Sequence, residues 1–244
     1  MTHTTTRLLA LVILLALCMA AHPSEAQQQP APSQTEELFR AKDNVSQTPT
    51  FMPSQHYLVR VVLFTQDARR GGVVFLGDSL TEGWLIHKEF QEHGLRNRGI
   101  GGDTTFGLLM RLHEIVQEKP EKIFIMIGVN DLIKNELHGL IQRYEHIVNT
   151  LGNALPGAEI FIQSILPVNW EDFPQASQYV DNDKILTMNK RLEELARRNG
   201  LEYLDLAPRF TNRAGNLKKA LSIDGIHINE KGYDLWFSLI KDRV

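Results

Sequence analysis

Short apolar runs alternate with stretches of helical periodicity from residue 71 to residue 244. Continuous apolar runs are typical of strands covered on both faces. Five segments fit that description, the second being more polar than the rest: 73–76, 95–100, 123–127, 160–166 and 203–206. Helices are predicted between them at 104–118, 137–155 and 183–199. Gly200 follows the last of these helices and is a natural C′ residue. This alternation predicts an α/β fold, with a parallel sheet between two layers of helices.

An apolar segment at 57–64 precedes this regular region. We expect a helix that lies against the edge of the domain, although the β-branched residues of the segment would also suit a strand. The pattern shows no internal repeat and no second folded unit. Residues 36–244 are therefore predicted to form one domain.

The first 26 residues are typical of a secretory signal. Arg7 supplies a positive charge, residues 8–20 are apolar but shorter than the roughly 20 residues that span a bilayer, and small residues follow. Cleavage is expected after Ala21 or Ala26, and the alternative is an uncleaved N-terminal anchor. Residues 27–35, rich in Gln, Pro and Ser, are predicted to be a flexible linker. We expect a secreted or periplasmic protein, without stable membrane insertion once the signal is removed.

Charge and cysteine content exclude several classes of function. The formal net charge is −3 and the basic residues form only short pairs, so we expect no nucleic-acid partner. Cys18, inside the predicted signal, is the only cysteine of the sequence. The processed chain would therefore hold no disulfide, no thiolate metal site and no cysteine nucleophile.

Ser79 follows the first predicted strand, in the segment GDSLT (77–81). The crevice of an open parallel sheet lies beyond the carboxyl ends of its strands. A serine on such a strand-to-helix turn has an exposed hydroxyl and a backbone N–H near a helix N-terminus, which suits a nucleophile. Taken alone, the segment favours a role for Ser79 as the cap of the helix, with Glu82 completing a capping box.

Two further strands are followed by groups that could bind an oxyanion. The glycine-rich segment 99–104, which contains Gly102, would bring backbone N–H groups close to a ligand, although a plain tight turn or a phosphate cradle are alternatives. Asn130 follows the third strand, and its side-chain NH₂ is a neutral donor. An Asx turn or a helix cap is the alternative for Asn130.

Asp224 and His227 lie three residues apart on a predicted loop, in the last part of the sequence. An imidazole acts as a base when an acceptor fixes its tautomer, and this spacing allows direct contact. A surface hydrogen bond or a pair of metal ligands is the alternative, but the sequence offers no further His/Asp cluster to complete a metal site. The conjunction of nucleophile, donors and oriented base, rather than any single motif, predicts a serine ester hydrolase.

These four segments resemble the four blocks of the SGNH, or GDSL, hydrolase family. The segments 97–104 and 164–169 are similar to its bacterial branch near platelet-activating-factor acetylhydrolase and sialate O-acetylesterase-like enzymes. The resemblance implies a flavodoxin-like three-layer α/β/α sandwich with a five-stranded parallel sheet, and no metal or organic cofactor. It implies Ser79 as nucleophile and His227 as base, oriented by Asp224. It also implies an oxyanion hole made by the N–H groups of Ser79 and Gly102 and the side chain of Asn130.

The substrate prediction rests on this resemblance and on export. Candidate substrate-binding residues are Asp78, Trp84, Asp103 and Trp170, and Phe173 lies in a similar position. Aromatic residues there suit stacking on a sugar ring or contact with an acyl chain, and ordinary packing is the alternative. We expect removal of a short acyl group, chiefly acetyl, from a carbohydrate. The alternatives are a lysophospholipase or thioesterase and, from another class, a non-catalytic carbohydrate-binding module.

Overall fold

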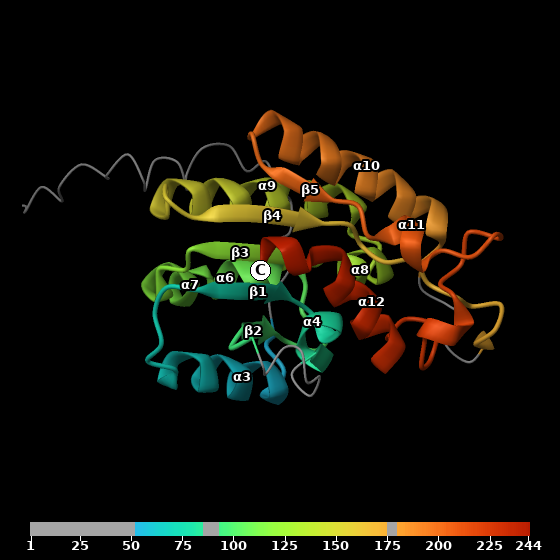
Figure 1. Ribbon diagram of the computed structural model, residues 1–244, viewed down its shortest axis with the longest axis horizontal. Helices are drawn as coiled ribbons and strands as arrows, with labels where there is room; N and C mark the ends of the chain where they lie inside the picture. The colour runs from blue at the N-terminus through green and yellow to red at the C-terminus, as the bar shows by residue number, and fades with distance from the viewer. Residues whose placement is uncertain (1–51, 85–92, 175–179) are drawn as a thin grey trace, which may run out of the picture. The chain divides into compact units, whose positions relative to one another are not determined.

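The computed structural model describes residues 52–84, 93–174 and 180–244 (Figure 1). The predicted signal, the linker and the first residues of the predicted domain lie outside the described residues, so those boundaries stay predictions. Among the described helices, none has the length and apolar character that crossing a membrane requires.

Within the described residues, five parallel strands form one sheet in the order β2-β1-β3-β4-β5. Their bounds are β1 (Val73–Gly77), β2 (Arg96–Gly99), β3 (Lys122–Met126), β4 (Glu159–Gln163) and β5 (Glu202–Leu204). Each strand overlaps a predicted run, and the five-stranded parallel sheet is confirmed. Gly77 of β1 pairs with Gly99 of β2 and with Met126 of β3, so the carboxyl ends of these three strands lie side by side at one end of the sheet.

Helices cover both faces of the sheet, which makes the fold a three-layer α/β/α sandwich (Figure 1). One face is covered by α6 (Thr105–Met110), α7 (Leu112–Glu118), α8 (Val129–Ile133), α9 (Leu137–Ala154) and α10 (Asn182–Arg198). The other face is covered by α4 (Ser79–Gly83), α11 (Ala207–Phe210) and α12 (Glu230–Ile240). Two short 3-10 helices complete this part, η3 (Lys219–Leu221) and η4 (Lys241–Arg243).

Successive side chains of the strands enter two separate cores, as the alternation of a strand requires. Val74 and Leu76 of β1 pack under the helices of the first face. Phe75 between them faces α12 and stacks on Phe124 with ring centroids 4.6 Å apart, and Phe124 in turn stacks on Phe161 at 4.5 Å. Burial on both faces is the reason that the strands are continuously apolar in sequence.

The stretch 104–118, predicted as one helix, is two helices. Arg111 stands between α6 and α7 with φ −120° and ψ 10°, outside the helical region. Its side chain is 1% exposed and turns into the interior to reach Asp103. A buried ionic contact therefore interrupts the helix where the sequence carries neither Gly nor Pro.

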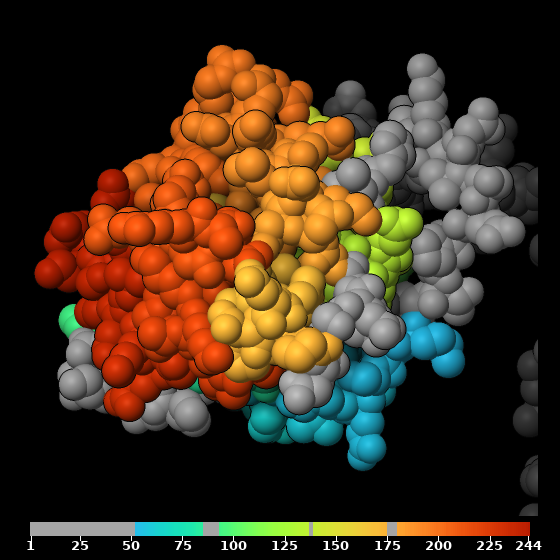
Figure 2. All heavy atoms as spheres, turned by 90° about the vertical axis from the view of Figure 1, so that its right-hand side faces the viewer, coloured from blue at the N-terminus to red at the C-terminus, as the bar shows by residue number. Residues whose placement is uncertain are grey.

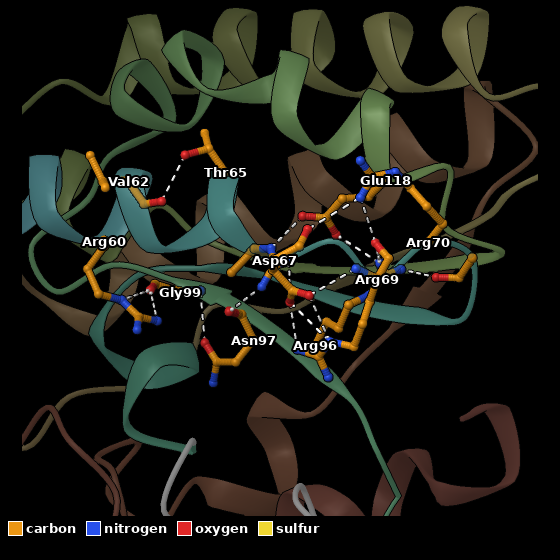
Figure 3. Close-up of polar contacts among 12 residues, drawn as sticks. Arg60, Val62, Thr65, Asp67, Arg69, Arg70, Arg96, Asn97, Gly99 and Glu118 are labelled. Carbon is orange, nitrogen blue, oxygen red and sulfur yellow. Dashed lines mark hydrogen bonds and ion pairs between the residues drawn. The ribbon is translucent and has the colours of Figure 1, made fainter.

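The segment 57–64 is part of a helix, α3 (Gln55–Gln66), as expected, and is not a strand. The helix lies along the β2 edge of the sheet (Figure 1) and is fixed there by polar contacts, shown close up in Figure 3. Arg60 Nη2 donates to the carbonyl oxygen of Gly99 at 2.9 Å. After the helix, Asp67 accepts from Arg98 at 2.9 Å, and Arg98 also donates to Glu118 at 2.6 Å. These contacts hold α3 beside the end of β2.

Candidate active site

Ser79 is the first residue of α4, directly after β1. The N-cap of that helix is Asp78, whose side chain accepts from the backbone N–H of Leu80 at 3.0 Å, so the alternative role of Ser79 as the cap is wrong. Ser79 Oγ lies 2.9 Å from Nε2 of His227. Nδ1 of the same ring lies 2.6 Å from Oδ2 of Asp224. Hydroxyl, imidazole and carboxylate thus form one continuous hydrogen-bonded chain.

The turn 224–227 fixes the imidazole. The backbone N–H groups of Ile226 and His227 donate to Oδ1 of Asp224 at 3.0 and 2.8 Å. Gly225 has a left-handed φ of 95°, and its carbonyl oxygen accepts from Asn169 N at 2.8 Å. Partial burial raises the pKa of Asp224, but hydrogen bonds from the His227 ring and from the turn backbone outweigh it, so the pKa lies below its usual value. Asp224 is therefore an ionised acceptor at neutral pH.

Two of the three predicted oxyanion donors, Gly102 and Asn130, lie just after the two strands that flank β1. Gly102 lies in the tight turn after β2, with a φ of 75° that glycine adopts without strain, and Asp103 N donates to Ile100 O at 3.0 Å. Asn130 lies in the first turn of α8, after β3, and its Nδ2 donates to the carbonyl oxygen of Asp103 at 2.9 Å. This bond holds the two donor loops to each other. Amide donors of this kind stabilise the negative charge that develops on oxygen in acyl transfer.

Figure 2 shows the face of the molecule toward which the carboxyl ends of the strands point. The segment after β4 (gold) lies beside the C-terminal segments (orange to red), and the beginning of α3 (blue) lies toward the opposite side of this face. The bond between Asn169 and Gly225 joins the first two of these segments. The hydroxyl and the Asn130 amide belong to the first turns of α4 and α8, and Gly102 and the imidazole belong to loops.

A family model described as "GDSL-like Lipase/Acylhydrolase family" matches residues 75–235, which include both Ser79 and His227. The chain belongs to this family. The family assignment agrees with the resemblance of the four sequence blocks, and it makes the protein an ester hydrolase.

The most similar proteins include acetylhydrolases and acylhydrolases. Platelet-activating factor acetylhydrolase IB subunit alpha2 of Rattus norvegicus is 29% identical over 187 residues, covering 74% of this chain and 77% of that protein. A crystallised GDSL-like lipase of Bacteroides thetaiotaomicron is 25% identical with a TM-score of 0.68, covering 76% of this chain and 95% of that one. An N-acylneuraminate cytidylyltransferase of Streptococcus agalactiae is 28% identical over 187 residues, which are 75% of this chain but 41% of that protein.

In this GDSL-like acylhydrolase Asp103, a candidate for substrate binding, points away from the surface. Its side chain is fully buried, and Oδ2 accepts from Nε and Nη2 of Arg111 at 3.0 and 2.9 Å. Burial raises the pKa of Asp103, and Arg111 opposes that rise. Arg111 Nη2 also donates to the carbonyl oxygen of Gly77 at 3.2 Å. Asp103 therefore joins the loop of Gly102 to the end of β1 and does not face a ligand.

Two more candidates for substrate binding also lie inside the acylhydrolase. Asp78 is 1% exposed, and burial raises its pKa to about 7. Trp84 is wholly buried, stacked on Trp236 with ring centroids 4.4 Å apart and in edge contact with Phe75. The expectation that Trp84 lines the pocket is corrected by this packing, because the indole ring is buried between α12 and Phe75 of β1.

The remaining aromatic candidates lie on the loop after β4. Trp170 is half-buried, packs against the core and donates from Nε1 to Val180 O at 2.6 Å. Phe173 lies beside Gly225, since a Cβ built on that glycine would be 3.1 Å from the Phe173 side chain. Phe173 is thus next to the turn that carries His227, while Trp170 mainly supports its own loop.

A cavity of about 230 Å³ adjoins the loop after β2 that carries Gly102, called the donor loop from here on. It is lined by Met52, Ser54, Tyr57, Gly101, Gly102, Asp103, Thr104 and Lys134. Sequence reasoning missed the contribution of α3 to this wall and missed Lys134, although Lys134 follows Asn130 by four residues. A larger open groove of about 540 Å³ lies at the β5 edge, between α10 and α11, away from Ser79. In the part of the chain that the structure describes, no group of three His, Cys, Asp or Glu side chains could hold a metal ion.

Proposed function

We propose that this acylhydrolase removes short acyl groups, chiefly acetyl, from a carbohydrate ester, with Ser79 as nucleophile and His227 as base. The single observation that carries the proposal is the chain of contacts from Ser79 Oγ to His227 Nε2 (2.9 Å) and from His227 Nδ1 to Asp224 (2.6 Å). A serine hydroxyl needs such a base in order to attack a carbonyl carbon.

The reaction follows from these positions in two halves. His227 takes the Ser79 proton as Oγ bonds to the ester carbonyl carbon, and the N–H groups of Ser79 and Gly102 and the Asn130 amide stabilise the oxyanion. The imidazolium, stabilised by ionised Asp224, returns the proton to the leaving alcohol, and the acyl group stays on Ser79. Water then loses a proton to His227, attacks the acyl-enzyme and frees the carboxylic acid together with the Ser79 hydroxyl.

Three observations support a short acyl group on a sugar. The cavity beside Gly102 is about 230 Å³, below the range of about 300–1,000 Å³ that is common for small-molecule sites, so it offers no room for a long acyl chain on that side of Ser79. Among the relatives, one is named as an acetylhydrolase and another for an N-acylated sugar acid. The hydroxyl groups of Ser54 and Thr104 in the cavity wall also suit a polar substrate. The predicted signal supports a secreted or periplasmic place of action.

Replacing Ser79 by Ala tests the nucleophile. We expect Ser79→Ala to lower kcat for p-nitrophenyl acetate by a factor on the order of 10⁶, with the fold unchanged by circular dichroism. The matched control is Ser238→Ala, because Ser238 is an exposed serine of α12 whose hydroxyl donates only to Leu235 O. A fluorophosphonate label should attach to the parent and to Ser238→Ala but not to Ser79→Ala. Turnover by Ser79→Ala at the parent rate would falsify the assignment.

The acyl preference needs a separate panel. p-Nitrophenyl esters of two to twelve carbons and acetylated sugars should give the highest kcat/KM for acetyl. A clear preference for chains of eight carbons or more, or for lysophospholipids, would reject the acetyl proposal while leaving Ser79 as the nucleophile.

A further inference from the structure

We propose that the cavity beside the donor loop binds an anionic group of the substrate, a carboxylate or a phosphate, and that Lys134 is the residue that recognises it. The inference rests on the proposed function and narrows the substrate to an acylated sugar that carries an acidic group. Three features of the described residues lead to it: the spacing along α8, the charges around the cavity and the size of the cavity.

Lys134 is the C-cap of α8 and lies on the same side of the helix as Asn130. They are four residues apart, and Lys134 N donates to Asn130 O at 3.1 Å, so the helical turn continues through the lysine. Side chains at this spacing are neighbours, with Cβ atoms about 5–6 Å apart. Asp131 and Leu132 point to the interior instead, since both are buried. An ammonium group therefore stands one helical turn from the amide proposed to bind the oxyanion.

The charges around the cavity leave Lys134 without a carboxylate partner among the described residues. Asp103 is bound by Arg111, and its side chain has no exposed surface. Glu82, on the α3 side of the same loop, is paired with Arg60 and accepts from Gly101 N at 2.5 Å. Asp103 and Glu82 are thus engaged by other residues, and among the described residues no ion pair neutralises the ammonium group of Lys134.

The cavity wall also carries the hydroxyl groups of Ser54 and Thr104. Ser54 Oγ accepts from Tyr57 N at 3.0 Å and Thr104 Oγ1 accepts from Gly107 N at 3.3 Å, so each hydroxyl hydrogen is available to a ligand. Two hydroxyl groups and an ammonium group that has no carboxylate partner in the described part of the chain make this wall complementary to an anion. The cavity volume of about 230 Å³ suits one part of a substrate, while the ester carbonyl occupies the space over Ser79.

The experiment compares three methyl glycosides that carry an acetyl group at the same hydroxyl: a glucoside, a glucuronide and a glucoside 6-phosphate. The parent should prefer one or both anionic substrates. Lys134→Met should lower kcat/KM for the preferred anionic substrate by roughly three- to fivefold and leave the neutral glucoside unchanged, as expected for a solvent-exposed ion pair. Lys134→Glu should lower it further. The matched control Lys190→Met, at an exposed lysine of α10 in the distant groove, should change nothing.

A second measurement does not depend on the position of the acetyl group. Methyl glucuronide and methyl glucoside 6-phosphate are tested as inhibitors of p-nitrophenyl acetate hydrolysis, with neutral methyl glucoside as reference. At least one anion should inhibit the parent more strongly than methyl glucoside, and Lys134→Met should remove that difference. The stronger of the two anions distinguishes carboxylate from phosphate.

Equal inhibition by the three glycosides, or an anionic preference that survives in Lys134→Met, overturns the inference. Both results would be obtained on an enzyme that turns over p-nitrophenyl acetate through Ser79, so the proposed function would stand. A parent without esterase turnover would instead contradict the proposed function itself.

Discussion

Replacing Arg111 is the strongest test of how the donor loop is held in place. Its guanidinium is 1% exposed and donates twice to Asp103 and once to the carbonyl oxygen of Gly77, at distances of 2.9 to 3.2 Å. Arg111→Met removes all three bonds and leaves a fully buried carboxylate without a cation. Breaking a buried pair in this way costs about 3–5 kcal/mol. We expect the free energy of unfolding at pH 8, measured in urea by circular dichroism, to fall by that amount.

The loss should depend on pH, because Asp103 can take up a proton. Burial raises the pKa of Asp103 and Arg111 opposes the rise, so removing Arg111 moves the pKa of the folded variant further above the unfolded value of about 3.9. A folded-state pKa above the unfolded one means that the folded variant binds more protons, so its stability increases as the pH falls. Arg111→Met should therefore recover part of its loss between pH 8 and pH 5.

The double variant Arg111→Met/Asp103→Asn is the control. A neutral amide needs no cation, so the second change should restore part of the lost stability at pH 8. The kcat for p-nitrophenyl acetate should fall in Arg111→Met because Asp103 O holds the Asn130 amide at 2.9 Å. The reasoning is refuted if Arg111→Met loses the same free energy at pH 5 and pH 8, or if Asp103→Asn deepens the loss.

Two further variants, the second with a matched control, test the contacts of α3 with the sheet and the turn that carries His227. Hydrogen bonding from Arg69 lowers the pKa of Asp67 well below its usual range, although burial opposes this. The ionised carboxylate of Asp67 therefore stabilises the fold above pH ~4, and this stabilisation is lost as the pH falls further. Asp67→Asn should lower the free energy of unfolding by about 1.5 kcal/mol at pH 7 and by less at pH 3, in urea titrations; equal losses at both would contradict it. Gly225→Ala should both destabilise the fold and reduce kcat, because φ is 95° and the new Cβ would lie 2.5 Å from Asn169 O. Gly200→Ala, with φ 65° and no atom within 4 Å of its Cβ, should lose only about 1–2 kcal/mol and keep its kcat, and a similar kcat in both variants would refute the steric argument.

The strands could be predicted because burial on both faces leaves a continuous apolar run, as at Phe75 between Val74 and Leu76. The proximity of Asp224 and His227 could be predicted because three residues of separation allow one turn to close. Both are local properties of the chain, and a single sequence carries them directly.

Other features depend on distant partners. Trp84 is buried by Tyr233 and Trp236, which lie about 150 residues further along the chain, so its residue type alone did not indicate which side it faces. The break at Arg111 arises from its ion pair with Asp103 rather than from a helix-breaking residue. The cavity wall formed by α3 required knowledge that this helix lies beside the end of β2.

The large sequence separation between Ser79 and His227 also affects how the enzyme folds. The hydroxyl belongs to the turn after the first strand, and the imidazole precedes the last long helix, at a sequence separation of 148. Contacts of such large sequence separation form slowly, since the intervening chain must first be ordered. In a refolding experiment, recovery of hydrolysis should lag behind the recovery of helical circular dichroism, and the delay would measure how late the two ends of the domain come together.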